Sequence, residues 1–286
     1  MKDRLIELIN YRKPDLVVCT HSLPCSILAG TRFENPLLPP VVAVATDFMV
    51  HPYWPIQGVE GFVVASEDAA GRLVERGANK GRIRVFGIPV DSLADEFKAN
   101  EKQIDTERKP PYEVLVLAGG KRLAPYVTTW PKTVNLLVES SKIKKGSLIW
   151  NVVCGKPSAF SKLLKESVDD REDVRIFNYV TDFLSLLRRM DFVVTKPGGL
   201  ILAEAMALGV PALLVSRGSG QEAANCEFIV SHGGGVFLNS EKLILKFLDN
   251  AITDPSIILG LKKMAKKIGK PDSAKKTANW ILAGLK

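Results

Sequence analysis

A strand–turn–helix–strand segment in residues 192–225 constrains the fold of this chain more than any other stretch. Phe192–Thr195 is apolar and rich in β-branched residues, which is typical of a strand covered on both faces. Pro197–Gly199 ends that strand, and the apolar run Leu200–Leu208, followed by a glycine, predicts a buried helix. Another apolar run at Ala212–Val215 predicts the next strand. This order predicts a parallel α/β sheet with helices packed on its faces.

The start of the predicted helix has the features of an anion-binding site. Gly198 and Gly199 let backbone amides approach a ligand there. Glu204 lies one turn into an otherwise apolar helix, and a polar loop is expected at Gly220–Glu222. Because the carboxyl ends of parallel strands meet at one edge of a sheet, we expect an anion pocket with a carboxylate that holds a diol. Such a pocket suits a nucleotide sugar; the alternative for Glu204 is a solvated helix carboxylate.

Composition excludes several classes of protein. The chain has 286 residues, 46% of them hydrophobic, and its apolar runs are shorter than the ~18–20 residues of a membrane-spanning helix. Its four cysteines form no CxxC pair and it has three histidines. We therefore expect buried thiols rather than a metal site or a disulfide framework, and a cytosolic protein.

The net charge of +8 is compatible with nucleic acid, an anionic membrane or phosphate-bearing substrates, and by itself does not choose among them. No nucleic-acid-binding motif is present and basic residues are not interleaved with aromatic ones, so we expect no nucleic acid partner. The lysine-rich stretches 142–145 and 261–268 suit an anionic membrane surface. The alternative is that they are solvated faces of ordinary helices.

Strands and helices alternate along the chain. Strands are expected at 15–19 (short and buried), 41–45, 61–65, 83–86, 112–117, 148–154, 174–177, 192–195 and 212–215. A charged, aperiodic segment, 92–111, is the linker candidate. We predict two parallel-sheet domains that face a cleft, over 1–105 and 106–270. A helix within 271–286, capped by Ser273, is expected to pack back on the first domain.

Two groups of motifs, in order, resemble one family. They are Thr46–Trp54 (TDFMVHPYW), Phe62–Glu67 and Gly87–Val90 in the first half, and Thr195–Leu200 (TKPGGL), Glu204–Gly209 and Gly220–Asn225 in the second. They resemble the monogalactosyldiacylglycerol synthases and processive diacylglycerol glucosyltransferases, and more distantly the enzyme that adds N-acetylglucosamine to lipid I. The resemblance covers almost the whole chain. It implies a GT-B glycosyltransferase with two Rossmann-like domains.

In this family the carboxyl domain binds a UDP-sugar and the amino domain receives a lipid acceptor at the membrane. The resemblance implies that Glu204 holds the ribose hydroxyls and that Gln221 and Glu222 contact the sugar, while helix-start amides meet the diphosphate. Backbone near Val180 would read the uracil edge. The expected donor-binding residues are Gly119, Gly120, Val180, Gly198, Gly199, Leu200, Glu204, Gln221 and Glu222. The implied reaction is inverting and metal-independent, needs no cofactor, and moves a hexosyl group from the UDP-sugar to diacylglycerol or a related lipid. The protein is then expected to be cytoplasmic and peripheral to the membrane.

Glycosyl transfer also needs a base within hydrogen-bond reach of the acceptor hydroxyl. Asp47 lies at the carboxyl end of a predicted strand, and we expect it to be the base, with His51 binding or orienting the acceptor. The alternatives are a turn-forming Asp47 and a packed His51 ring. His21 either faces the cleft or caps the helix that follows it, and His232 is expected to be structural.

The amino half offers only about four strands, fewer than a Rossmann-like domain needs. Members of the family begin with a Gly-rich segment that has no counterpart here, so we expect an incomplete N-terminal domain. Either an upstream segment or a partner chain completes it, or the protein is a remnant. The competing hypothesis is a non-catalytic UDP-sugar-binding module that needs such a partner. A UDP-sugar epimerase is disfavoured because the stretch 46–54 has no evident use in one.

Overall fold

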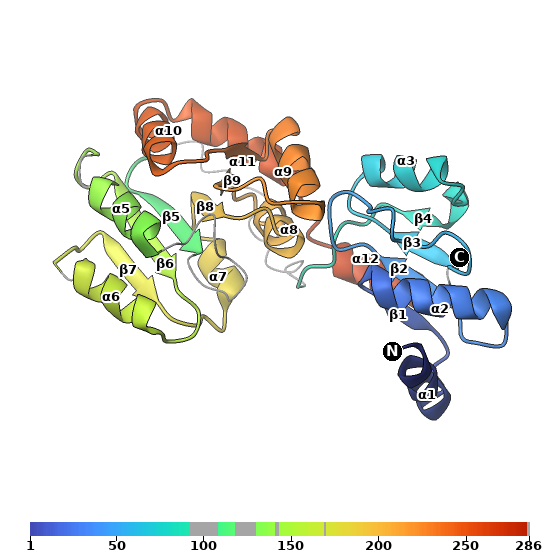
Figure 1. Cartoon of the computed structure of the whole chain (residues 1–286). Helices are drawn as coiled ribbons and strands as arrows, with labels where there is room; N and C mark the ends of the chain where they lie inside the picture. The colour runs from blue at the N-terminus through green and yellow to red at the C-terminus, as the bar shows by residue number, and fades with distance from the viewer. Residues whose placement is uncertain (92–107, 118–129, 141–142, 169, 285–286) are drawn as a thin grey trace. The chain divides into compact units, whose positions relative to one another are not determined.

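The computed structural model describes residues 1–91, 108–117, 130–140, 143–168 and 170–284. The chain divides into two compact units, each described by itself below: residues 1–94 with 270–286, and residues 95–269 (Figure 1). The predicted domain boundary at 105/106 and most of the predicted linker lie outside the described residues, so that boundary stays a prediction. None of the described helices is long and apolar enough to cross a lipid bilayer.

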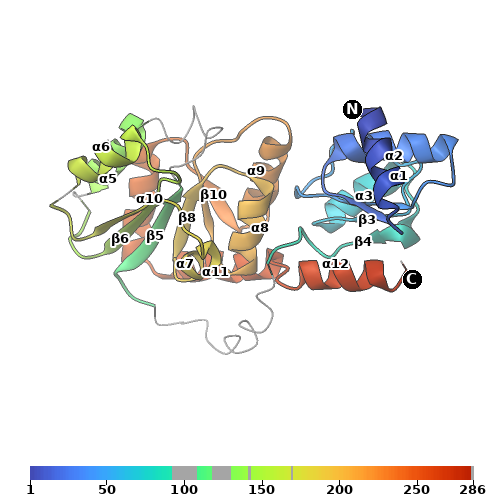
Figure 2. The same cartoon turned by 90° about the horizontal axis from the view of Figure 1, so that it is seen from below.

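The first unit is built on a parallel sheet, whose order among the described residues is β1-β2-β3-β4. Its elements are α1 (Lys2–Arg12), β1 (Val17–Cys19), α2 (Ser22–Glu34), β2 (Val41–Val44), β3 (Gly61–Val63), α3 (Glu67–Glu75), the 3₁₀ turn η1 (Lys80–Arg82), β4 (Ile83–Arg84) and α12 (Ser273–Leu282). Helices α1 to α3 cover one face of the sheet and α12 covers the other (Figure 2). Since β2 and β3 are buried on both faces, their sequences are apolar throughout.

Strand β1 is an edge strand, so the prediction of a buried strand there is wrong in part. Among the described residues it pairs with β2 alone, and the Val18 side chain is 43% exposed. Val18 is in register with Val42 and shares its face of the sheet. On that face Trp280 of α12 packs against Val42 and Val63, so the helix covers the central strands rather than the edge.

Helix α12 is fixed to the first unit by a buried serine. The Ser273 hydroxyl donates to the carbonyl of Ile88 (2.8 Å) and accepts from the amide of Val90 (3.2 Å). The predicted role of Ser273 as helix cap is therefore wrong. Asp272 occupies the N-cap position without a side-chain hydrogen bond, and the serine hydroxyl bonds to a distant part of the chain instead.

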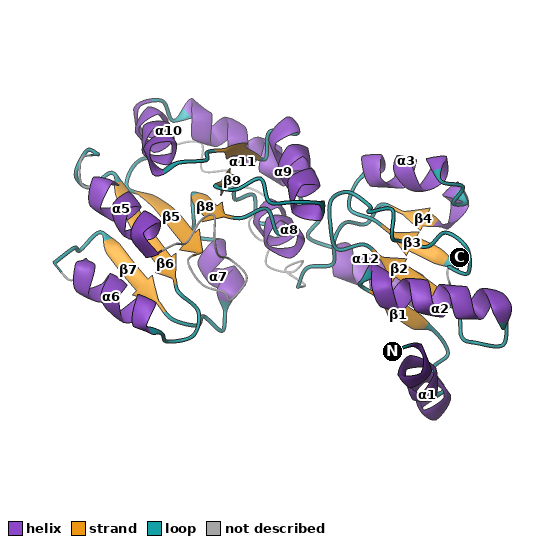
Figure 3. Ribbon diagram, in the orientation of Figure 1, coloured by secondary structure: helices purple, strands orange, loops and turns teal. Residues whose placement is uncertain are grey.

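The second unit has a larger parallel sheet of order β10-β9-β8-β5-β6-β7 among the described residues, with strands and helices alternating in sequence (Figure 3). Its elements are β5 (Tyr112–Leu117), α5 (Trp130–Ser140), β6 (Leu148–Val153), α6 (Ala159–Ser167), β7 (Val174–Phe177), α7 (Phe183–Leu187), β8 (Phe192–Thr195), α8 (Gly199–Ala207), β9 (Ala212–Leu214), α9 (Gln221–Ser231), β10 (Gly235–Phe237), α10 (Glu241–Thr253) and α11 (Ser256–Ile268). From β5 to β7 successive strands are added on one side of the sheet, and from β8 to β10 they are added on the other side. Open α/β sheets bind ligands at the point where the strand order reverses in this way, here between β5 and β8.

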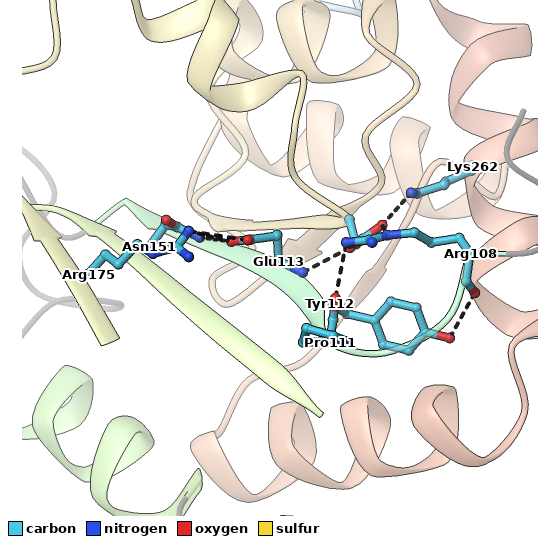
Figure 4. A network of polar contacts seen from close by, with 8 residues as sticks. Arg108, Pro111, Tyr112, Glu113, Asn151, Arg175 and Lys262 are labelled. Carbon is cyan, nitrogen blue, oxygen red and sulfur yellow. Dashed lines mark hydrogen bonds and ion pairs between the residues drawn. The ribbon is translucent and has the colours of Figure 1, made fainter. Parts of the chain in front are cut away.

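A buried ion cluster joins the start of this unit to α11. Asp191, whose side chain is 2% exposed, accepts from Arg108 (2.8 Å), Lys262 (2.5 Å) and the amide of Glu113 (2.8 Å) (Figure 4). Burial raises the pKa of the Asp191 carboxyl, but the two cations and the amide outweigh it, and the pKa lies below its usual value. Lys262 was part of a stretch predicted either to meet a membrane or to be solvated, and neither alternative holds for this residue, since the buried carboxylate binds it.

Candidate functional site

The central feature of the second unit is the start of α8, directly after the buried strand β8. Gly198 is the N-cap, with an extended backbone and no side-chain hydrogen bond to the helix. The first-turn N–H groups of a helix have no partner inside it and carry its positive dipole end. Leu200 in this turn is 53% exposed although α8 is otherwise largely buried. The helix therefore presents an uncapped, accessible N-terminus of the kind that binds phosphate groups.

The fold itself does not require a glycine at position 198. Its φ of −72° is open to any L-residue, and an added Cβ would meet Ile201 and Lys196 only at ordinary van der Waals distances. A glycine that neither conformation nor packing demands leaves space above the helix-start amides. An anion bound at this helix start would need such space.

Glu204 lies in the second turn of α8. Its neighbours Ala203 and Ala205 are buried, whereas Glu204 is half-buried. A carboxylate at this depth is partly desolvated and still accessible from one side, as a group that accepts hydrogen bonds from a diol must be.

Gln221 and Glu222 belong to the first turn of α9, so the predicted polar loop at 220–222 is wrong in part. Gly220, with φ of +56°, changes the chain direction just before the helix, and α9 begins at the next residue because those that follow are good helix formers. Helix α9, like α8, has no side-chain cap at its start. Gln221 is exposed and Glu222 is half-buried.

Lys196 is a further candidate site residue, which the sequence analysis did not include. Its ammonium group forms an ion pair with Glu222, and the two side chains are 29% and 34% exposed. The Asn225 side chain, fully buried, donates to the carbonyl of Pro197 (3.2 Å) and so fixes α9 to the turn before α8. The position of Lys196 could have identified it from the sequence, because a lysine directly before the Pro-Gly-Gly turn lies next to the predicted anion site.

The end of β7 carries the segment predicted to read a nucleobase. Val180 is half-buried and Tyr179 is 74% exposed. Asp182 accepts from the amide of Ser185 (3.2 Å) and caps α7. The Oδ1 atom of Asn178 is buried and has no hydrogen-bond partner within the described residues. Gly119 and Gly120, also predicted to bind the donor, lie outside the described residues.

In the first unit, Asp47 and His51 lie in the segment that follows β2. The strand ends at Val44, so Asp47 sits in a bend three residues beyond it rather than at the strand's last position. Both side chains are half-buried. The His51 ring lies against the Tyr53 ring, with centroids 4.3 Å apart, and its Nδ1 atom accepts from the amide of Tyr53 (3.2 Å). Since Nδ1 accepts, the neutral ring carries its proton on Nε2, which can donate to a ligand.

Side chains from α2 and from the two ends of α3 hold the segment Phe48–Trp54, which we call the His51 loop. The Ser66 hydroxyl donates to the carbonyl of Phe48 (2.9 Å), and the Ser26 hydroxyl donates to that of Tyr53 (2.9 Å). Arg76, at the end of α3, donates to the carbonyls of Pro52 (2.8 Å) and Trp54 (2.7 Å). The segment therefore has a defined conformation, as a catalytic or binding loop requires.

The other two histidines have structural roles. His21 caps α2, its Nδ1 accepting from the amide of Leu23 (3.1 Å), so the predicted capping role is confirmed. His232 stacks on Phe228 with ring centroids 4.0 Å apart, as predicted. All four cysteines are buried thiols, also as predicted. No cluster of three or more His, Cys, Asp or Glu side chains that could hold a metal ion occurs in the described part of the chain.

Two family models match the chain in sequence order. Residues 1–90 match monogalactosyldiacylglycerol (MGDG) synthase, and residues 114–277 match the glycosyltransferase family 28 C-terminal domain. A processive diacylglycerol β-glucosyltransferase of Bacillus pumilus (strain SAFR-032) is 30% identical over 93% of this chain and 67% of its own length. The chain belongs to the family of the processive diacylglycerol glucosyltransferases. The Bacillus subtilis (strain 168) protein of the same description is 27% identical over 98% of this chain and 71% of its own length.

Solved structures show the same two-sheet GT-B architecture. The UDP-GlcNAc 2-epimerase of Neisseria meningitidis, bound to UDP-GlcNAc, matches with a TM-score of 0.69 at 15% identity, over 99% of this chain and 80% of its own. MurG of Acinetobacter baumannii matches with a TM-score of 0.64 at 12% identity, over 99% and 78%. The predicted fold class is thus confirmed. Likeness at this identity concerns the fold and does not choose between transfer and epimerisation.

Proposed function

We propose that this protein transfers a hexosyl group from a UDP-sugar to diacylglycerol or a related lipid, as a step of glycolipid synthesis. The observation that carries the proposal is the family relationship, since a relative named as a processive diacylglycerol β-glucosyltransferase matches 93% of the chain. The geometry of both units supports it. The second unit has an uncapped helix start beside a lysine, and the first has a fixed loop with a carboxylate and an imidazole.

The donor would bind at the start of α8. There the helix-start amides of Gly199 and Leu200 and the ammonium group of Lys196 would neutralise the diphosphate, so that departure of UDP needs no metal ion. Glu204 would accept hydrogen bonds from the ribose hydroxyls, and Gln221 and Glu222 would bind the sugar. The uracil would lie against the backbone near Val180.

The chemistry we propose is a single displacement. The acceptor hydroxyl attacks the anomeric carbon from the face opposite UDP, the bond from that carbon to the diphosphate oxygen breaks, and the hydroxyl proton passes to Asp47. His51 suits the orienting role, because its Nδ1 is held by the Tyr53 amide and its Nε2–H can donate to the acceptor oxygen. The configuration at the anomeric carbon is inverted. The lipid acceptor places the reaction at a membrane surface, and we propose its cytoplasmic face.

Transfer is tested with purified protein, labelled UDP-glucose or UDP-galactose, and vesicles containing diacylglycerol. Wild type should form a labelled glycolipid, and Asp47→Asn should lower kcat by at least about 100-fold, as expected for loss of a general base. Asp68→Asn, which alters an exposed carboxylate in the first turn of α3, is the matched control. UDP binding without glycolipid from any donor would favour the binding-module alternative, and absence of UDP binding would contradict both.

A further inference from the structure

The outer face of α11, in the second unit, carries the exposed lysines Lys263, Lys266 and Lys267, which we call the lysine face. Their spacing of three and four residues places them next to one another on the helix. The opposite face of α11 packs into the unit, where Ile258 and Ala265 are buried. The lysine face is therefore the solvent side of a helix that its other side holds in place.

No carboxylate balances the charges of the lysine face. The sequence has no Asp or Glu from residue 255 to residue 271. In the part of the chain that the structure describes, none of the three ammonium groups forms an ion pair. The neighbouring helix α10, in contrast, has Glu241 and Asp249 together with its lysines. Like charges three and four residues apart destabilise a helix, so the lysine face weakens the element that carries it.

The helix dipole accounts for only part of this arrangement. Lys266 and Lys267 lie in the last turn of α11, where a cation is favourable. Lys263 lies a turn earlier, beyond the reach of that effect, and it is adjacent to both of the others. The aliphatic stem of Lys266 packs against Gly209, where an added Cβ would meet its Cγ atom at 2.6 Å. An external anion would account for a placement of charge that the helix alone does not favour.

The chemistry of the lysine face suits a flat anionic surface. Ammonium groups are hydrated point charges and lack the planar fork with which arginine binds a single phosphate. Residues 256–270 contain no aromatic residue and none of the large apolar side chains that are exposed. The face therefore offers no side chain to stack on a nucleic acid base or to insert among lipid chains. We propose that the lysine face binds the headgroups of anionic phospholipids and holds the second unit at a membrane by charge alone.

The choice of a lipid surface rests on the proposed function, which supplies an acceptor that resides in a membrane. The lysine face adds a contact that is separate from both the donor and the acceptor. Each lysine close to an anionic membrane should raise the affinity about 5-fold, so that the three together contribute about 100-fold. Because these lysines are exposed, added salt should weaken the binding.

Binding is measured by co-sedimentation with vesicles of phosphatidylcholine alone and of phosphatidylcholine mixed with phosphatidylglycerol. Wild type should bind the mixed vesicles in a salt-dependent manner and the neutral vesicles weakly. The triple variant Lys263→Gln, Lys266→Gln, Lys267→Gln should bind the mixed vesicles about 100-fold more weakly. Arginine at the same three positions keeps the charge and should restore the affinity of wild type. Failure of the arginine variant to bind, or binding that salt does not weaken, would overturn the proposal.

The matched control removes the same charge from exposed positions of other helices in the unit. It is the triple variant Lys162→Gln, Lys165→Gln, Lys242→Gln, in α6 and α10. It should bind the mixed vesicles like wild type, and equal weakening in the two glutamine variants would show an effect of net charge and overturn the proposal. The Tm of every variant should lie within about 4 °C of wild type, as expected for surface substitutions.

Sugar transfer to diacylglycerol in neutral detergent micelles separates this inference from the proposed function. There the glutamine variant of the lysine face should be as active as wild type. Vesicle binding that depends on the lysine face, without transfer by any of the proteins, would support the lysine face and contradict the enzyme. Transfer with equal vesicle binding in all variants would support the enzyme and overturn the lysine face. Tighter binding of single-stranded RNA than of mixed vesicles, lost in the same variant, would assign the face to nucleic acid and also overturn the proposal.

Discussion

Because Lys196 and Glu222 form an ion pair, we predict that one substitution changes the affinities for UDP and for UDP-glucose in opposite directions. The structure pairs the proposed diphosphate-binding ammonium with the proposed sugar-binding carboxylate. When UDP alone binds Lys196, the ion pair with Glu222 is broken, and UDP has no sugar that could bind Glu222 instead. A UDP-sugar binds both groups. Glu222→Gln should therefore strengthen binding of UDP and weaken binding of UDP-glucose.

The magnitudes follow from exposure and charge. Both side chains are about a third exposed, at 29% and 34%, so their mutual pairing contributes only ~0.2–1 kcal/mol. Its removal should tighten UDP binding by up to about 5-fold. A charge-assisted hydrogen bond contributes ~1.5–3 kcal/mol, so Lys196→Met should weaken UDP binding by roughly 10- to 150-fold. Glu222→Gln loses one such bond to the sugar, and UDP-glucose binding should fall by about 10-fold.

Isothermal titration calorimetry with UDP and with UDP-glucose, on both single variants and the double variant, measures these terms. In the double variant UDP affinity should equal that of Lys196→Met, because the gain from Glu222→Gln acts only through Lys196. Glu227→Gln, on the exposed side of the same helix, is the control and should change neither affinity. Equal weakening of UDP and UDP-glucose binding by Glu222→Gln would show that Glu222 does not compete with the diphosphate for Lys196.

Three further predictions address stability and the two sites. Asp191→Asn should destabilise the second unit by about 3 kcal/mol, because it leaves Arg108 and Lys262 without their buried carboxylate, and Tm should fall by roughly 6–12 °C in calorimetry. The folded protein lowers the pKa of Asp191, so the carboxylate's contribution to the free energy of unfolding is complete above the ordinary aspartate pKa of about 3.9 and is lost as pH falls through the lowered value. In urea titrations the difference in free energy of unfolding between wild type and Asp191→Asn should therefore disappear in that acid range. A difference that does not change with pH would contradict this role of Asp191. Arg76→Met should lower kcat about 10- to 100-fold with unchanged UDP affinity, because it frees the His51 loop, and Arg76→Lys should restore part of the rate; full activity of Arg76→Met would remove this role. Glu204→Ala should weaken UDP binding by ~1–3 kcal/mol in calorimetry, and equal loss with 2′,3′-dideoxy-UDP would argue against ribose as its partner.

Much of the fold was predictable because its signals are local. Strands such as Phe192–Thr195 are buried on both faces and read as apolar runs, and Gly209 ends its helix with a φ of +68° as predicted. Ser66 caps α3 by accepting from the amide of Ala69 (3.1 Å), a pattern that is visible in the sequence. The order of strands in each sheet needed the structure, because pairing depends on distant residues.

The errors share one physical origin, which is competition from long-range contacts. Ser273 has the composition of a helix cap, but the 88–90 backbone takes its hydroxyl. Glycine dominates the local signal at residues 220–222 and predicts a loop there. The helix that begins at Gln221 carries Asn225, which donates to the distant Pro197 carbonyl, and this contact is not visible in the local sequence. Lys196 was overlooked because its partner lies 26 residues away.

We expect the start of α8, together with Lys196 and Glu204, to bind UDP, and a crystal structure of the protein with UDP would decide this. Diphosphate oxygens should lie within hydrogen-bond distance of the amides of Gly199 and Leu200 and of the Lys196 ammonium, with the ribose hydroxyls at Glu204. UDP bound elsewhere, or a saturating soak that leaves these amides without a ligand, would show that the donor site is not here.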